Sequence, residues 1–191
     1  MNSNNFIKIL IAIPIIVFII SCNDDTSPPP PIIPNEEELI TTLNYTLISQ
    51  SGDDTVVLSF QDLDGDGGNA PKVSTGELLR NTSYNGSITL LNEQESPAEN
   101  ITLEIEEEAL EHQFFFSSNS DSLSMQYADQ DSLGNPIGLL STLMTKGPDA
   151  AKINIILRHE PDKKGLGVSD GDITNAGGET DIEVSFDITI K

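Results

Sequence analysis

The clearest pattern of hydrophobic and polar residues lies at the carboxyl end of the chain. From residue 181 to residue 190, every second position is apolar and the positions between are polar or charged. The apolar set is Ile182, Val184, Phe186, Ile188 and Ile190, and the polar set is Asp181, Glu183, Ser185, Asp187 and Thr189. Because the side chains of a strand point alternately to its two faces, this pattern predicts a strand with one buried and one wet face.

Similar short apolar runs recur along the chain, separated by Gly, Asn, Asp and Pro. They are LITTLNYTLIS, TVVLSFQDL, SYNGSITLLN, HQFFFS, SLSMQYAD, IGLLSTLMT and AKINIILRH, with a weaker one at KVSTGELL. Short strands at such spacing are typical of a sandwich or a barrel. For residues 37–191 the sequence therefore predicts an all-β domain, an Ig-like antiparallel β-sandwich of about 8 strands.

One segment of this domain favours a helix instead. Residues 96–99 read SPAE, a capping box with proline at the first helical position. Ile101, Ile105 and Ala109 follow at four-residue spacing among glutamates, which favour helices and are depleted in strands. The spacing predicts a short helical insertion over about 97–111. A strand through the same apolar residues is the competing interpretation.

The amino end has the pattern of a secretory signal. In residues 1–21, Lys8 precedes an apolar run of 12 residues at 9–20, which is shorter than the about 20 residues of a membrane-spanning helix. The run ends at IISC, 19–22, which resembles a lipobox, the site where a diacylglycerol is attached to a thiol before the signal is removed. Because Cys22 is the only cysteine, we expect it to carry lipid, palmitate included, rather than to form a disulfide.

Residues 22–36 combine acidic residues with proline and predict a tether between this lipid and the domain. Asn23-Asp24-Asp25 resembles the acidic export tag of some Gram-negative lipoproteins, although an acidic linker would look the same. The stretch SPPPPIIP, 27–34, should form an extended polyproline segment. We therefore expect a lipid-anchored protein of a Gram-negative outer membrane, exposed at the cell surface, with the periplasmic face as the alternative.

The charge of the chain is strongly one-sided. It has 9 Lys and Arg against 31 Asp and Glu, a formal net charge of −22. Nucleic acid is therefore not an expected partner, because binding to phosphates needs a basic surface. An acidic surface is compatible with binding of cations or of basic partners.

Three stretches carry a resemblance to a known group of proteins. They are QDLDGDGGNAP, LLNEQESPAENITLEIEEEALEHQFFF and LRHEPDKKGLGVSDGDITNAGGETDIEVSFDITI. They resemble uncharacterised acidic bacterial surface lipoproteins, a group sometimes labelled as type 1 periplasmic-binding-fold proteins, and the similarity covers residues 37–191. The label implies two α/β lobes, whereas the strand pattern predicts one β-sandwich. The resemblance implies no particular activity.

An acidic, glycine-rich loop is the first candidate site for a cofactor. Asp62, Asp64 and Asp66 are spaced like the first half of an EF-hand calcium loop. The twelfth position is Val73, where an EF-hand requires a bidentate glutamate. The sequence thus leaves two alternatives, an irregular Ca²⁺ site between strands or a solvated acidic turn.

The two histidines are the second candidate. His112 follows the glutamate-rich segment, and His159 ends an apolar run and precedes Glu160. If the fold brings both histidines together with Glu160, Glu108 or Asp162, they could hold a transition metal such as Zn²⁺, which takes three or four ligands. The alternative is that each histidine only caps an element or hydrogen-bonds at the surface.

The sequence contains no GxSxG, Walker A or GxGxxG motif, and lipidation would consume the one thiol. We therefore expect a non-enzymatic binding module, with a metal cation as the expected ligand, in association with a TonB-dependent uptake system and its outer-membrane receptor. A structural or adhesive protein-interaction module without a metal is the alternative. A hydrolase that uses paired carboxylates ranks third.

Overall fold

The computed structural model describes residues 38–65 and 67–191; the predicted signal, Cys22, the tether and Asp66 lie outside these residues. The segment Glu36–Lys191 groups as one compact unit. The strands described are β1 (Thr42–Ser49), β2 (Thr55–Gln61), β3 (Lys72–Val73), β4 (Gly76–Leu78), β5 (Ser83–Leu91), β6 (His112–Ser118), β7 (Leu123–Tyr127), β8 (Leu140–Thr145), β9 (Asp149–His159) and β10 (Glu179–Ile190). Helix α1 spans Ile101–Glu107, and two 3₁₀ turns, η1 and η2, span Val168–Asp170 and Ile173–Asn175.

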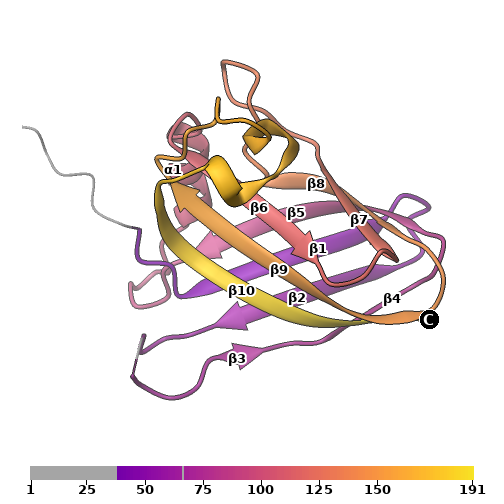
Figure 1. Cartoon of the computed structure of the whole chain (residues 1–191). Helices are drawn as coiled ribbons and strands as arrows, with labels where there is room; N and C mark the ends of the chain where they lie inside the picture. The colour runs from indigo at the N-terminus through magenta and orange to yellow at the C-terminus, as the bar shows by residue number, and fades with distance from the viewer. Residues whose placement is uncertain (1–37, 66) are drawn as a thin grey trace, which may run out of the picture. The chain divides into compact units, whose positions relative to one another are not determined.

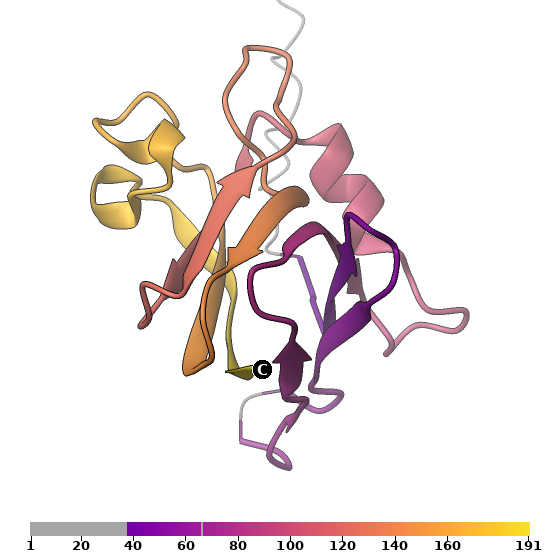
Figure 2. The same cartoon turned by 90° about the vertical axis from the view of Figure 1, so that its right-hand side faces the viewer.

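The strands form two sheets that face each other (Figures 1 and 2). One has six strands in the order β3-β2-β1-β5-β8-β7, and the other has four in the order β4-β10-β9-β6. Neighbouring strands are antiparallel except for the parallel pair β4 and β10. The predicted antiparallel sandwich is confirmed, and the described residues do not form two α/β lobes.

The core lies between the sheets and follows the alternation seen in the sequence. Tyr45 on β1, Leu143 on β8, Phe114 on β6 and Phe186 on β10 are among its fully buried side chains. The Tyr45 hydroxyl is hydrogen-bonded to Ser141 Oγ at 2.8 Å, so this buried polar group is satisfied. Burial of alternate residues from both sheets is what stabilises this arrangement.

Strand β10 bears out the predicted alternation over most of its length. Its five apolar residues, from Ile182 to Ile190, are all buried. The pairing with β9 shifts register between Thr180 and Ile182, as at a β-bulge, where the extra residue of the bulged strand is re-aimed. Asp181 occupies that position and its side chain is fully buried. The prediction that Asp181 belongs to the wet face is therefore wrong.

The helix lies inside the predicted range but is shorter. It begins after Asn100, whose side chain accepts a hydrogen bond from the Thr102 amide, so Asn100 is the N-cap rather than a residue of the SPAE box. Glu99 pairs instead with Asn92 in an isolated β-bridge. Ile101 and Ile105 are buried as predicted, and α1 packs against β5.

No helix among the described residues is long and apolar enough to cross a membrane. Figure 1 shows that β6 begins, β9 ends and β10 begins at the same end of the four-stranded sheet, beside α1. This end of the sheet positions the candidate site.

Candidate metal centre

The two histidines of the chain lie directly opposite each other. His112 is the first residue of β6 and His159 the last of β9, and the antiparallel register pairs them. Their rings stack with centroids 4.7 Å apart and an interplanar angle of 25°. Both residues are buried. The structure thus brings together two imidazoles that lie far apart in the sequence.

Asp181, on the neighbouring strand β10, lies close to both histidines. Its Oδ2 atom lies 3.9 Å from His112 Nε2, and its Oδ1 atom lies 3.9 Å from His159 Nδ1. The bulge in β10 brings the carboxylate here, because regular alternation would have directed it to the solvent face.

The fourth side chain, Glu38, comes from the other layer. It precedes β1 of the six-stranded sheet, and its Oε1 atom lies 3.2 Å from His112 Nε2. Its side chain is only 6% exposed. One ligand atom from each of Glu38, His112, His159 and Asp181 lies within 4.8 Å of all the others. We call these four residues the histidine–carboxylate cluster.

The orientation of His112 is set by a backbone carbonyl. Its Nδ1 atom lies 3.2 Å from the Glu108 carbonyl oxygen. Because a carbonyl oxygen can only accept, Nδ1 carries the hydrogen, and the neutral ring then has its lone pair on Nε2. Nε2 is the atom that faces Glu38 and Asp181. A carbonyl that holds the second ring nitrogen in this way is the usual support of a metal-binding histidine.

Hydrogen bonding in the cluster is incomplete. Among the described residues, His112 Nε2 and Glu38 Oε2 are buried without a hydrogen-bond partner. The 3.2 Å contact between Nε2 and Glu38 Oε1 is close enough for an ion pair, but it does not have the geometry of a hydrogen bond. Buried polar atoms are nearly always hydrogen-bonded, so these two atoms require an explanation.

The electrostatics of the cluster favour a cation. Burial disfavours the protonated ring, but the Glu38 carboxylate, the Glu108 carbonyl and Asp181 outweigh burial and raise the pKa of His112 above 6.5. Burial likewise opposes ionisation of Glu38, yet the pairing with His112 dominates and lowers the pKa of that carboxyl. A divalent cation would balance the charge of the two carboxylates, Glu38 and Asp181.

The distances fit a small cation after a modest contraction. Nitrogen and oxygen ligands about 2.0–2.2 Å from a tetrahedral cation lie about 3.3–3.6 Å from one another. Three contacts in the cluster measure 3.2, 3.9 and 3.9 Å. Two imidazoles with two carboxylates suit Zn²⁺ or a similar divalent transition metal better than Ca²⁺, which prefers oxygen ligands throughout.

A second group of ligand atoms lies next to the cluster and shares a residue with it. Glu111, His159 and Glu160 place one ligand atom each within 4.8 Å of the others. Unlike the cluster, this group is partly open, because both glutamates are exposed. The sequence-predicted Glu160 belongs here rather than with His112.

The other sequence candidates lie elsewhere. Asp62 Oδ1 accepts hydrogen bonds from the Asp64 and Gly65 amides, and Asp64 Oδ2 accepts from both nitrogens of Asn69. These hydrogen bonds, all within residues 62–69, are those of an acidic turn. Neither aspartate joins a potential metal-ligand group within the described residues, and Asp66 lies outside them.

Two further residues that the sequence offered as partners of the histidines do not contribute their carboxylates. Asp162 is exposed, and its Oδ1 atom accepts from the Lys164 amide. Glu108 supplies only its backbone carbonyl to His112.

Two cavities lie near these elements. One, of about 470 Å³, is bordered by Glu38 and Asp181 of the cluster and also by Asp62 and Glu183, so it adjoins the cluster. The acidic loop and the cluster therefore face the same hollow, although the loop contributes no ligand to the cluster.

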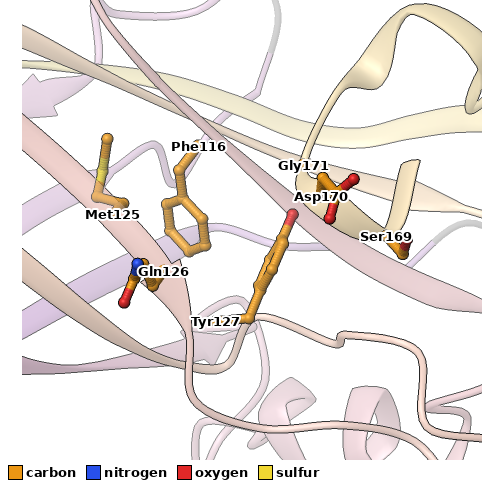
Figure 3. A pocket seen from close by; sticks show the side chains of 7 residues that line it. All are labelled: Phe116, Met125, Gln126, Tyr127, Ser169, Asp170 and Gly171. Atoms are coloured by element: carbon orange, nitrogen blue, oxygen red, sulfur yellow. The ribbon is translucent and has the colours of Figure 1, made fainter. Parts of the chain in front are cut away.

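The other cavity, of about 530 Å³, lies between strands β6 and β7 and the η1 turn (Figure 3). Figure 3 shows the Tyr127 hydroxyl directed toward Asp170 and Gly171. That hydroxyl donates to the Phe114 carbonyl at 2.7 Å and accepts from Gln113 Nε2 at 3.3 Å, and burial raises the pKa of Tyr127 to about 12. With its hydroxyl so engaged, this cavity gives weaker grounds for a site than the histidine–carboxylate cluster.

Sequence reasoning missed Glu38 and Asp181. The one signal for Asp181 was its place three positions after a glycine pair in a strand that pairs with the His159 strand. Glu38 carried no signal, because it is one of three consecutive glutamates next to the tether.

Comparison with known proteins adds no identification: no family model, no curated protein and no solved structure matches the chain. The class that the fold and site define is an all-β sandwich with a buried histidine–carboxylate cluster.

Proposed function

We propose that this domain is a non-enzymatic binding module for a divalent transition-metal cation, held by the histidine–carboxylate cluster. The observation that carries the proposal is the convergence of two imidazoles and two carboxylates from three strands and the segment before β1, with ligand atoms within 4.8 Å of one another. Such side chains are rarely brought together out of water unless they are paired or bind a metal.

Energetics support this interpretation over a purely structural role. A buried network of charges stabilises a fold only when its geometry is good and its remaining polar atoms are satisfied. Here Glu38 Oε2 and His112 Nε2 lack hydrogen bonds among the described residues. A cation between the ligands would give both atoms a partner and would offset the charge of the carboxylates.

The wider role follows from the sequence and stays a prediction. We propose that Cys22 carries a lipid anchor in a Gram-negative outer membrane and that the cation site serves a TonB-dependent uptake system. Support comes from the resemblance of IISC to a lipobox and from the net charge of −22, which would attract cations. Mass spectrometry of the protein from intact cells should find an acylated Cys22 as the first residue. Recovery of unacylated protein with residues 1–21 intact would contradict the anchor.

Titration calorimetry tests the cation site. The untagged full chain, stripped with a chelator, is titrated with Zn²⁺, Co²⁺ and Ca²⁺. We expect one Zn²⁺ per chain and a loss of affinity of about 100-fold or more in Asp181→Asn, which keeps the shape of a ligand but not its charge. Asp187→Asn, an exposed carboxylate on the same strand, is the matched control and should bind like the parent. Absence of both heat and thermal shift with every cation would refute the proposal.

A protein-interaction module without a metal is the second candidate. Ile48 and Val57, on neighbouring strands of the six-stranded sheet, are 46% and 49% exposed. Exposed apolar side chains on one sheet face can mark a binding surface. Co-purification from outer membranes separates the candidates. A partner retained by Asp181→Asn but lost in Ile48→Ser/Val57→Ser would favour this alternative.

A further inference from the structure

The histidine–carboxylate cluster raises the question of how a cation reaches it. The side chains of its four residues are between 0% and 7% exposed. A hydrated ion must lose its water on the way, and this step is easier when other ligands replace the water as it leaves.

The group of Glu111, His159 and Glu160 adjoins the cluster on its solvent side. Glu111 precedes His112 and Glu160 follows His159, so the paired histidines hold the two glutamates next to each other. The Glu160 amide donates to the Glu111 carbonyl at 2.6 Å, which fixes the two chain segments together. The carboxylates are exposed, yet each has an oxygen within 4.8 Å of a ligand atom of the buried His159.

We infer that Glu111 and Glu160 form an outer station for the cation, from which it passes to the cluster by way of His159. The inference rests on the proposed function. His159 is the one residue common to both groups, and an imidazole has two nitrogens with which it can contact ions on different sides. A cation held first by two carboxylates and then by His159 moves from water to the cluster in steps between ligand atoms no more than 4.8 Å apart.

The cavity beside Glu38 and Asp181 is the competing route, since Asp62 and Glu183 also border it. Their carboxylates are less suited to carry an ion. Asp62 Oδ1 accepts two backbone hydrogen bonds, and Glu183 Oε1 accepts from Asn154 Nδ2 at 3.0 Å. Neither residue comes within ligand distance of a histidine in the groups found among the described residues.

A residue on the route has a different kinetic effect from a ligand of the final site. Removing a ligand weakens equilibrium affinity. Removing a station on the route slows binding and release by the same factor, because the ion uses the same path in both directions, and the affinity is unchanged. This pattern separates a transfer role from a structural or ligand role.

Stopped-flow absorbance with Co²⁺ as the probe tests the inference on the untagged full chain. We expect Glu111→Gln/Glu160→Gln to slow association by about tenfold or more, since charged groups at a site entrance raise on-rates by about that factor or more. Dissociation should slow by the same factor, because the ion leaves by the path on which it enters. The Co²⁺ affinity should stay within about threefold. Glu106→Gln/Glu107→Gln removes the same charge from exposed positions on α1 and should retain the parental rates.

The outcomes separate this inference from the proposed function. If the parent binds no Co²⁺, the proposed function fails and the station with it. If the parent binds Co²⁺ and Glu111→Gln/Glu160→Gln retains the parental rates, only the station is refuted. Slowing in Asp62→Asn/Glu183→Gln instead would assign the route to the cavity and would also refute the station. Urea midpoints equal to that of the parent would show that these variants fold.

Discussion

Two buried charged groups lie close together in this domain and differ in how well they are satisfied. Lys163, four residues after His159, donates from Nζ to the Ala109 carbonyl at 2.5 Å, to Asp131 Oδ2 at 3.1 Å and to the Pro136 carbonyl at 3.1 Å. An ammonium group has three hydrogens, so each of them has an acceptor here. Asp131 also accepts from the Leu133 and Asn135 amides. The histidine–carboxylate cluster shows no such completeness.

The difference indicates different roles. The Lys163 group joins three chain segments and needs nothing further, which is expected of a group that stabilises the fold. The cluster holds stacked imidazoles against two carboxylates, with Glu38 Oε2 and His112 Nε2 unbonded among the described residues. A buried polar atom that a fold leaves without a partner needs an explanation, such as a functional role or a bound ion or water.

The largest effect should come from disrupting the buried, fully hydrogen-bonded group around Lys163. Lys163→Met should lower the free energy of unfolding by about 3 kcal/mol or more, because it leaves the Asp131 carboxylate buried without its cation. Urea denaturation followed by circular dichroism measures this, and Zn²⁺ should not restore the loss. Lys164→Met, at the exposed neighbouring position, is the control. A Lys163→Met midpoint equal to the parental one would show that the group is not stabilising.

A cation bound in the histidine–carboxylate cluster should stabilise the domain, by less than the loss expected for Lys163→Met. Free Zn²⁺ at 100 times its dissociation constant adds about 2.7 kcal/mol to the unfolding free energy. For a domain of this size that raises Tm by about 5–10 °C. Differential scanning calorimetry should show the rise in the parent and in Asp187→Asn but not in Asp181→Asn. An equal rise in all three would place the bound ion outside the cluster.

A smaller effect should come from pH. As pH rises, the stability of the metal-free protein should fall, whereas its affinity for Zn²⁺ should increase. The pKa of His112 is raised above 6.5 in the fold, so the stability of this pairing is complete below pH 6.5 and is lost as pH rises through the folded pKa. Zn²⁺ instead needs the neutral ring, so its affinity should increase over the same range. Urea midpoints with a chelator, and Zn²⁺ titrations, check both slopes. His112→Gln removes the titrating ring, so the stability of the metal-free variant should not show the decrease that His112 causes in the parent as pH rises.

The smallest effect should come from the acidic turn. Asp62→Asn/Asp64→Asn removes two carboxylates whose oxygens already accept hydrogen bonds within the turn. Zn²⁺ affinity should change by less than about twofold, because neither carboxylate belongs to a potential metal-ligand group among the described residues. A loss comparable to that of Asp181→Asn would mean that the turn, not the cluster, supplies ligands.

Local patterns in the sequence were sufficient to predict the sandwich. The period-two alternation of β10 depends only on which residues prefer burial, and the structure confirms it from Ile182 onward. The helix limits were less predictable. Asn100 rather than Ser96 caps α1, because Glu99 is paired with Asn92 in an isolated β-bridge, and the capping motif alone does not indicate that pairing.

The candidate site was predictable only in part, because contacts between segments distant in the sequence bring its residues together. His112 and His159 could be singled out as ligand types at the ends of apolar runs, but their pairing depends on the register of β6 with β9. Asp181 reaches the cluster through a bulge, which reverses the face that alternation assigns to it. Glu38 reaches it because the segment before β1 meets the opposite sheet, a contact between layers.

X-ray absorption at the zinc edge of the Zn²⁺-loaded full chain tests the central claim most directly. We predict a first shell of two nitrogens and two oxygens at about 2.0–2.2 Å, with the scattering pattern of two imidazole rings, and a changed shell in Asp181→Asn. A shell of oxygens alone, without imidazole, would contradict the assignment of the cation to the histidine–carboxylate cluster.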